Sequence, residues 1–220
     1  MKIELLIQKQ INDIIQKLVY KGICDDQNYA ILKYTTESLI DVTFPEASNL
    51  AVSLKNIEYD EIYKELSKNK QYHIKMADGN LLQLLYRIEG EKIISHRLTM
   101  FPSRNLELYQ NEPDLYEQDC IYADILKKNI VTFPLRFDYD YKPIDNHPKC
   151  HLSIGQYKNC RIPVFGPIMP KVFVGFIMKN FYNSFYCENS LHDFFKEGEK
   201  HELIYTIRNK EKYEMHLNLL

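Results

Sequence analysis

The chain has 220 residues, of which 45% are hydrophobic and 26% are charged. This composition is typical of a globular protein and excludes a chain that is disordered for want of apolar residues. Its 28 Lys and Arg against 30 Asp and Glu give a formal net charge of -2, which excludes attraction of the whole molecule to nucleic acid or membrane. Nucleic acid could be bound through a local patch only.

The cysteines indicate the redox compartment of the protein. Their number is odd, they are widely spread, and polar residues interrupt the first apolar stretch of the chain. We therefore expect free thiols in a reducing cytoplasm and no secretory signal. Charges also break the longer apolar stretches before they reach the roughly 18 apolar residues of a membrane-spanning helix. Cytoplasmic localisation without membrane contact is the expectation.

The N-terminal half predicts helices at two places and strands between and after them. Apolar residues at steps of three and four predict an amphipathic helix over 2–20 that Gly22 ends. Runs of β-branched and aromatic residues predict short strands between 28 and 57, and helical spacing returns at 59–69. Residues 71–101 predict three strands joined by tight turns at "ADGN" and "EGEK".

The middle of the chain is harder to assign. Residues 102–130 form a polar stretch in which 119–129 favour a short helix. Alternating apolar and polar residues then predict strands at 130–141 and 150–157, and Pro134 places the first of these at a sheet edge or a bulge.

The C-terminal part predicts a buried helix and a hairpin. Residues 170–186 begin with a proline and carry aromatic residues along one side, with further apolar residues elsewhere. We expect this helix to be buried by the sheet and by a protein partner or a second subunit. Residues 202–219 favour a final hairpin. The element order predicts an α+β fold, with a mainly antiparallel sheet and an N-terminal helix in 1–22, as a single domain over 1–220.

Ionisable residues are densest in the stretch "RFDYDYKPIDNHPKCHLSIGQYKNCRIP". Because strand residues at steps of two share a face, Arg136, Asp138 and Asp140 point one way. If the next strand folds back as a hairpin, His151 can join them on this polar face. Arg136 could then hold a phosphate, and a neighbouring carboxylate could orient the imidazole of His151 for acid-base chemistry. The alternative is a seam of salt bridges that fastens strands together.

A zinc site is a further interpretation of the same stretch. His147, Cys150 and His151 form an HxxCH pattern, and Cys160 follows at a distance. Adjacent residues of a strand point to opposite faces, so Cys150 and His151 cannot both join His147 around one ion. We therefore expect no metal.

A second group of candidates lies at the end of the predicted three-stranded segment. His96 and Arg97 are neighbours, so they point to opposite faces unless the strand bends, and Pro102 makes such a bend possible. Both residues are candidates for binding phosphate or another ligand. The alternative is a surface arginine beside a partly buried histidine.

The segments "SHRLTMFPS", "YQNEPDLY", "IYADILKKNIVTFPLRFDYD" and "HPKCHLSIGQYKNCRIPV", followed by "FIMKNFY", resemble a family of bacterial proteins known only as a domain of unknown function. The resemblance covers about residues 50–187 and implies no known activity. This sequence departs from the family pattern at Cys150, where a small Ser or Ala is usual. The matching positions are His96, Arg97, Arg136, Asp138, His147, Pro148, His151, Gly155, Cys160, Arg161 and Pro163.

Three classes of function remain open. The first is a metal-independent nuclease or phosphodiesterase that needs no cofactor, as an effector of a bacterial toxin or anti-phage defence system. In it, His151 or His147 would serve as general acid or base, and Arg136 and Arg161 would bind phosphate.

The other two classes involve no reaction. A non-catalytic adaptor would bind a larger partner enzyme of a defence system and use the dense stretch as a scaffold. A small-ligand sensor would line its site with Tyr139, Tyr141 and Arg161.

Overall fold

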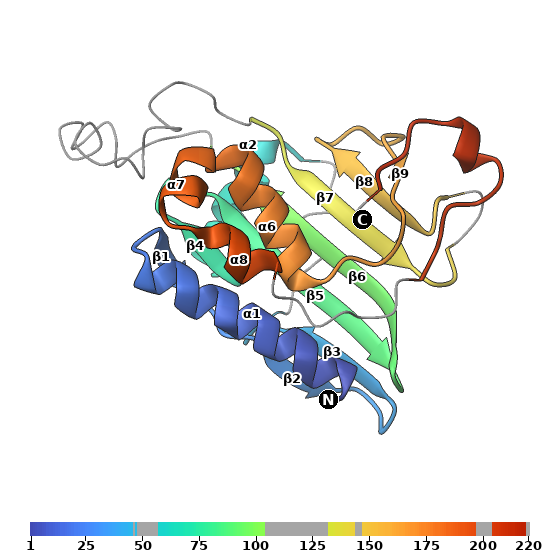
Figure 1. Cartoon of the computed structure of the whole chain (residues 1–220), viewed down its shortest axis with the longest axis horizontal. Coiled ribbons are helices and arrows are strands. Elements are labelled where there is room, and N and C mark those ends of the chain that lie inside the picture. Colours follow the sequence, from blue (N-terminus) through green and yellow to red (C-terminus); the bar gives the residue numbers. More distant parts are fainter. Residues whose placement is uncertain (46, 48–56, 104–131, 144–146, 197–203, 219–220) are drawn as a thin grey trace.

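The computed structural model describes residues 1–45, 47, 57–103, 132–143, 147–196 and 204–218 (Figure 1). Within them, one sheet of nine strands carries the fold, and neighbouring strands pair antiparallel. The strands are β1 (Cys24–Gln27), β2 (Ile31–Tyr34), β3 (Leu39–Thr43), β4 (Ile74–Met76), β5 (Leu81–Glu89), β6 (Lys92–Phe101), β7 (Leu135–Asp140), β8 (Cys150–Ile154) and β9 (Ile162–Pro163).

The sheet branches at β5. Its main order is β1-β4-β5-β6-β7-β8-β9, and β3 also pairs with β5 and carries β2 on its other side. The turn between β4 and β5 places Gly79 at φ +87°, and the turn between β5 and β6 places Gly90 at φ +61°. Both are left-handed conformations that glycine adopts without steric cost. The three strands expected within 71–101 are therefore confirmed.

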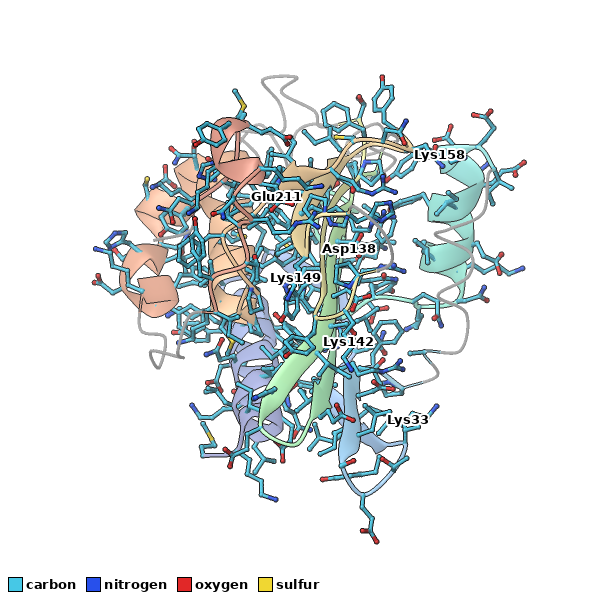
Figure 2. The ribbon with its side chains drawn as sticks, turned by 90° about the vertical axis from the view of Figure 1, so that its right-hand side faces the viewer. Lys33, Asp138, Lys142, Lys149, Lys158 and Glu211 are labelled. Atoms are coloured by element: carbon cyan, nitrogen blue, oxygen red, sulfur yellow. The ribbon has the colours of Figure 1, made fainter. Side chains whose placement is uncertain are left out.

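Helices cover the two faces of the sheet unequally. One face packs against α1 (Ile3–Tyr20), α6 (Pro170–Phe181), α7 (Asn183–Glu188) and α8 (Leu191–Lys196), as Figures 1 and 2 show. On the other face lies α2 (Tyr59–Lys68), which buries Ile62 and Leu66 against Leu81 and Phe101 at one end of β5 and β6. The rest of that second face carries the polar side chains described below.

The α+β architecture with a mainly antiparallel sheet is as the sequence predicts, and so are the N-terminal helix and the helix near residue 59. None of the helices in the described part of the chain has the length and apolar character that crossing a membrane requires. Strand residues expected at 49–54 and the helix expected at 119–129 lie outside the described residues. A single domain over 1–220 stays a prediction.

The helix expected at 170–186 is wrong in its length. It breaks at Tyr182, which leaves helical geometry at φ -131° and ψ 46° and separates α6 from α7. The Tyr182 hydroxyl donates to Asp78 at 2.8 Å, so a contact with the β4–β5 turn accompanies the break. Burial of α6 is as expected, although α1, α7 and α8 of the same chain cover it together with the sheet. A protein partner at this helix stays a prediction.

The final hairpin is also wrong over its described residues. A short 3-10 helix (η3, Glu211–Tyr213) lies where the second strand should begin, and the flanking segments bond to Phe165 instead of to each other. The Phe165 N–H donates to the Leu217 carbonyl at 2.9 Å, and the Thr206 N–H donates to the Phe165 carbonyl at 2.8 Å. Leu217 also forms an isolated parallel bridge with Val164, next to β9.

Candidate functional site

The register of the central strands brings three candidates into one row. In the pairing of β6 with β7, Arg97 stands opposite Asp138, and in the pairing of β7 with β8, Asp138 stands opposite His151. Residues directly opposite in an antiparallel pair place their side chains on the same face, close enough to interact. The hairpin that the sequence allowed is therefore formed, and its polar face includes Arg97 from the preceding strand.

The Asp138 carboxylate is shared between two arginines. Arg97 Nε donates to Asp138 Oδ1 at 2.9 Å, and Arg136 Nε donates to Asp138 Oδ2 at 2.6 Å. The side chains of Arg97 and Arg136 are 27% and 29% exposed, against 16% for Asp138. The carboxylate thus lies beneath the two guanidinium groups. We refer to Arg97, Asp138 and Arg136 as the arginine cluster.

Electrostatics of the arginine cluster favour an ionised Asp138. Burial alone would raise its pKa, but the positive charges of Arg97 and Arg136 outweigh burial and lower the pKa below its usual value of 3.8. One negative charge is then shared by two positive charges. The arginine cluster therefore keeps a positive surplus at neutral pH.

His151 stands at the edge of the arginine cluster. Its Nε2 lies 4.0 Å from Asp138 Oδ2, and its Nδ1 lies 3.3 Å from the Pro148 carbonyl oxygen. A carbonyl oxygen only accepts, so this contact favours the tautomer of the neutral ring that carries its proton on Nδ1.

The titration of His151 fits a base. Burial lowers its pKa below 6.5; Asp138 and the Pro148 carbonyl oppose this effect, and Arg161 and Arg136 add to it. The ring is therefore mainly neutral at pH 7, with Nε2 ready to accept a proton. This response also places the charge of Arg161, which follows β8 in the chain, within electrostatic reach of His151.

A second row runs parallel to the first. Gln83, Thr99, Arg136 and Ser153 stand opposite one another on successive strands. Thr99 Oγ1 and Gln83 Oε1 are buried, and neither atom has a hydrogen-bond partner within the described residues. The polar face of the sheet therefore extends from Arg136 to the buried side chains of Thr99 and Gln83, in the direction of α2.

Three predicted candidates lie away from the arginine cluster. His96 and Tyr139 point to the opposite, helix-covered face, where their rings are 5.6 Å apart. There the Ile168 N–H donates to His96 Nε2 at 3.0 Å, and burial lowers the pKa of His96 to about 4. Asp140 is exposed and accepts a bond from the Lys142 N–H. His96 and Tyr139 therefore lie on the face opposite Asp138, and their expected roles in ligand binding stay predictions, as does the role expected for Asp140.

His147 is not joined to the cluster by any contact that the structure shows among the described residues. Its neighbour Pro148 contacts His151 through the backbone carbonyl, so the backbone of His147 lies near His151. The side chain of His147 is half-buried. Its expected role as acid or base stays a prediction.

The cysteines of the HxxCH pattern are engaged separately. Cys150 Sγ donates to the Gly166 carbonyl at 3.0 Å on the helix-covered face, and Cys160 Sγ accepts from the Ile154 N–H at 3.4 Å. Cys150 therefore points away from the face that carries His151. Over the described ranges, no three His, Cys, Asp or Glu side chains are grouped so that they could hold an ion.

A half-buried carboxylate outside this face escaped the sequence analysis. Asp78 lies in the "ADGN" turn and accepts from the Tyr182 hydroxyl at 2.8 Å and from the Asn80 side chain at 2.9 Å. Burial raises its pKa to about 6. The "ADGN" motif predicts the turn and its glycine. It does not predict Tyr182 as the partner of Asp78, because Tyr182 reaches Asp78 from a break between α6 and α7 that no local sequence pattern indicates.

Together, the open antiparallel sheet and the arginine cluster define an α+β protein with a polar face that carries paired arginines. Residues 23–219 match the family described as "Uncharacterized conserved protein (DUF2290)", and the chain belongs to this family. The matched region is wider than residues 50–187 and takes in β1 at one end and the segment beyond β9 at the other. No curated protein and no solved structure matches the chain.

Proposed function

We propose that this protein is a metal-independent phosphodiesterase that cleaves RNA, with the arginine cluster as its phosphate-binding site and His151 as its general base. The observation that carries the proposal is the way the arginines hold Asp138. Each uses its Nε–H on the carboxylate, and no bond from their terminal N–H groups is found among the described residues. Those groups are therefore available to a second anion.

A phosphate diester suits these donors. Its two non-bridging oxygens accept charge-assisted hydrogen bonds from guanidinium groups, often in parallel pairs. Asp138 holds the guanidinium groups of Arg97 and Arg136 on neighbouring strands, so they are positioned before the substrate arrives. The positive surplus of the cluster then opposes the charge that develops on the phosphate oxygens during reaction.

RNA provides its own nucleophile beside the phosphate. In the proposed reaction, His151 Nε2 accepts the proton of the 2′-hydroxyl, and the 2′-oxygen attacks phosphorus. The bond from phosphorus to the 5′-oxygen breaks, and that oxygen takes a proton from water as it leaves, after which His151 returns its proton to the solvent. The products are a 2′,3′-cyclic phosphate and a 5′-hydroxyl. DNA lacks the 2′-hydroxyl, so this route leaves it intact.

The test compares cleavage of matched RNA and DNA oligonucleotides by wild-type protein and variants. We expect cyclic phosphate ends from RNA only, and a loss of about 100-fold or more for His151→Ala, as is usual for a missing general base. Arg136→Gln should also lose activity. Arg87→Gln is the matched control, because Arg87 pairs with Asp41 on the same sheet at 2.7 Å outside the cluster.

Folding is checked alongside activity. A thermal melt of each variant separates lost chemistry from lost structure, and Arg136→Lys keeps a positive charge if Arg136→Gln does not fold. RNA that remains uncut by folded wild-type protein, or cleavage that survives His151→Ala, would overturn the proposal.

A further inference from the structure

We propose that the connection between β8 and β9 is a base-stacking subsite for single-stranded RNA, with Tyr157 as its platform. This inference rests on the proposed function, because it extends the phosphate-binding face to a neighbouring nucleotide. The connection runs over 155–161, from the end of β8 to Arg161.

Several bonds hold this connection in place. Its first residue, Gly155, turns the chain at φ +65° and donates its N–H to the Pro134 carbonyl at 2.7 Å. The Cys160 N–H donates to the Tyr157 carbonyl at 3.2 Å, and Cys160 Sγ accepts from Ile154. Tyr157 therefore projects from a bonded turn.

One face of the Tyr157 ring packs against Gly155. A Cβ atom placed on Gly155 would lie 3.4 Å from Tyr157 Cδ2 and 3.5 Å from Cε2, so the ring packs over the glycine backbone. The side chain is nevertheless 77% exposed. An aromatic ring that rests on backbone and faces solvent can accept the flat face of a base, whatever the base is.

The charges around Tyr157 fit a nucleic acid backbone. Lys158 is exposed at the tip of the connection, and Arg161 ends it within electrostatic reach of His151. Figure 2 shows Lys158 toward the upper end of the view and Asp138 nearer its centre. Positive side chains therefore accompany the path from the arginine cluster to Tyr157.

Distance along β8 determines which nucleotide the ring can reach. Gly155 is four positions after His151, and a strand rises about 3.3 Å per residue, so the two lie about 13 Å apart. The stacked base therefore belongs to a nucleotide beside the cleaved linkage. Bases inside a duplex are already stacked on each other, whereas those of a single strand can turn out onto an aromatic side chain. The occupant is single-stranded RNA.

Binding of a non-cleavable ligand tests this subsite without relying on catalysis. The probe is a fluorescent single-stranded oligonucleotide of 2′-O-methyl RNA, and anisotropy gives its Kd. We expect Tyr157→Ala to weaken binding about tenfold, since base stacking on an aromatic ring is typically of this size or larger. Tyr157→Phe should retain binding. Tyr213→Ala is the control, because Tyr213 is 94% exposed elsewhere.

The outcomes separate the two proposals. Wild-type protein that binds the probe through Tyr157 but leaves natural RNA uncut supports the subsite and overturns the cleavage proposal. Equal Kd values for wild-type and Tyr157→Ala overturn the subsite, whatever the cleavage assay shows. A duplex probe that loses the same affinity in Tyr157→Ala also overturns it, because stacking requires unpaired bases. Failure of wild-type protein to bind the probe overturns it as well.

Discussion

Arg97 of β6 and Asp138 of β7 face each other directly across the sheet and are joined by a 2.9 Å hydrogen bond from Nε to Oδ1. This pair ties together strands that are distant in sequence. It also fixes the position of the guanidinium group that we assign to phosphate binding. The same contact therefore serves both stability and the proposed function, and substitutions can separate the two.

The first prediction concerns Asp138→Asn. The amide has no negative charge to offset Arg97 and Arg136, so two half-buried positive charges face each other. We expect unfolding by urea to show a loss of about 2 to 4 kcal/mol. Asp41→Asn is the control, because Asp41 pairs with an arginine that is 50% exposed, and we expect that change to cost under about 1 kcal/mol. Equal losses would contradict a special role for Asp138.

The second prediction separates His151 from this framework. Among the described residues, His151 contacts the arginine cluster through the 4.0 Å approach of Nε2 to Asp138 Oδ2. His151→Ala should therefore lower the free energy of unfolding by about 1 kcal/mol or less, while RNA cleavage is lost. A large loss of stability in a thermal melt would make His151 a structural part of a polar seam.

The third prediction concerns how Arg161 affects His151. The positive charge of Arg161 contributes to lowering the pKa of His151 below 6.5. Arg161→Gln removes this effect, so the pKa of His151 should rise and the protonated ring should persist to higher pH. An NMR titration of the His151 ring measures this directly, and the acid limb of any cleavage profile should move in the same direction. A pKa that stays constant or falls would show that the two side chains do not interact.

Local patterns in the sequence predict much of this fold. Alternation and the two glycine turns define β4 to β6, and apolar spacing defines α1, because those signals act between near neighbours in the chain. Arg136, Asp138 and His151 could be assigned to one face for the same reason. The part of the site that lies within the β7–β8 hairpin could therefore be predicted from the sequence.

The contribution of Arg97 was beyond such reasoning. It lies 41 residues from Asp138 in sequence, and their contact depends on the register between β6 and β7. A shift of the register by one residue would send the side chain to the opposite face. Alternation leaves open registers that differ by two residues, and only one of them sets Arg97 opposite Asp138. The contact of Asp78 with Tyr182, across 104 residues, depends instead on where α6 breaks.

The error at the C-terminus has a different cause. Alternating residues indicate that a segment can be extended, but not which strand it will join. Here both segments bond to Phe165, so the expected hairpin partners each contact a third segment. Pairing is a tertiary choice that periodicity leaves open.

The fourth prediction concerns the turn between β4 and β5. Gly79 has φ +87°, and a Cβ atom there would lie 2.9 Å from the Ser103 Cβ. Gly79→Ala therefore combines backbone strain with a clash, and we expect it to cost about 2 to 4 kcal/mol in urea unfolding. Gly22→Ala is the matched control, since Gly22 has φ +74° with open space around it, and should cost only about 1 kcal/mol. Similar costs would contradict the close packing of this turn.

The last prediction concerns the pH dependence of stability at Asp78. Burial raises the pKa of this carboxyl from 3.8 to about 6, and its hydrogen-bond partners Asn80 and Tyr182 carry no positive charge. The folded protein therefore holds a proton there that the unfolded chain releases near pH 4. Stability from this group is greatest below pH 4, falls as the pH rises toward 6, and is lost above it, a change of about 3 kcal/mol.

Asp78→Asn tests that dependence because the amide does not titrate. Free energies of unfolding are compared at matched pH values, so that carboxylates common to both proteins cancel. We expect the variant to gain about 3 kcal/mol relative to wild type as the pH rises from 4 to above 6, because the cost of ionising this partly desolvated carboxyl is absent. Parallel pH curves for the two proteins would mean that Asp78 titrates equally in the folded and unfolded chains.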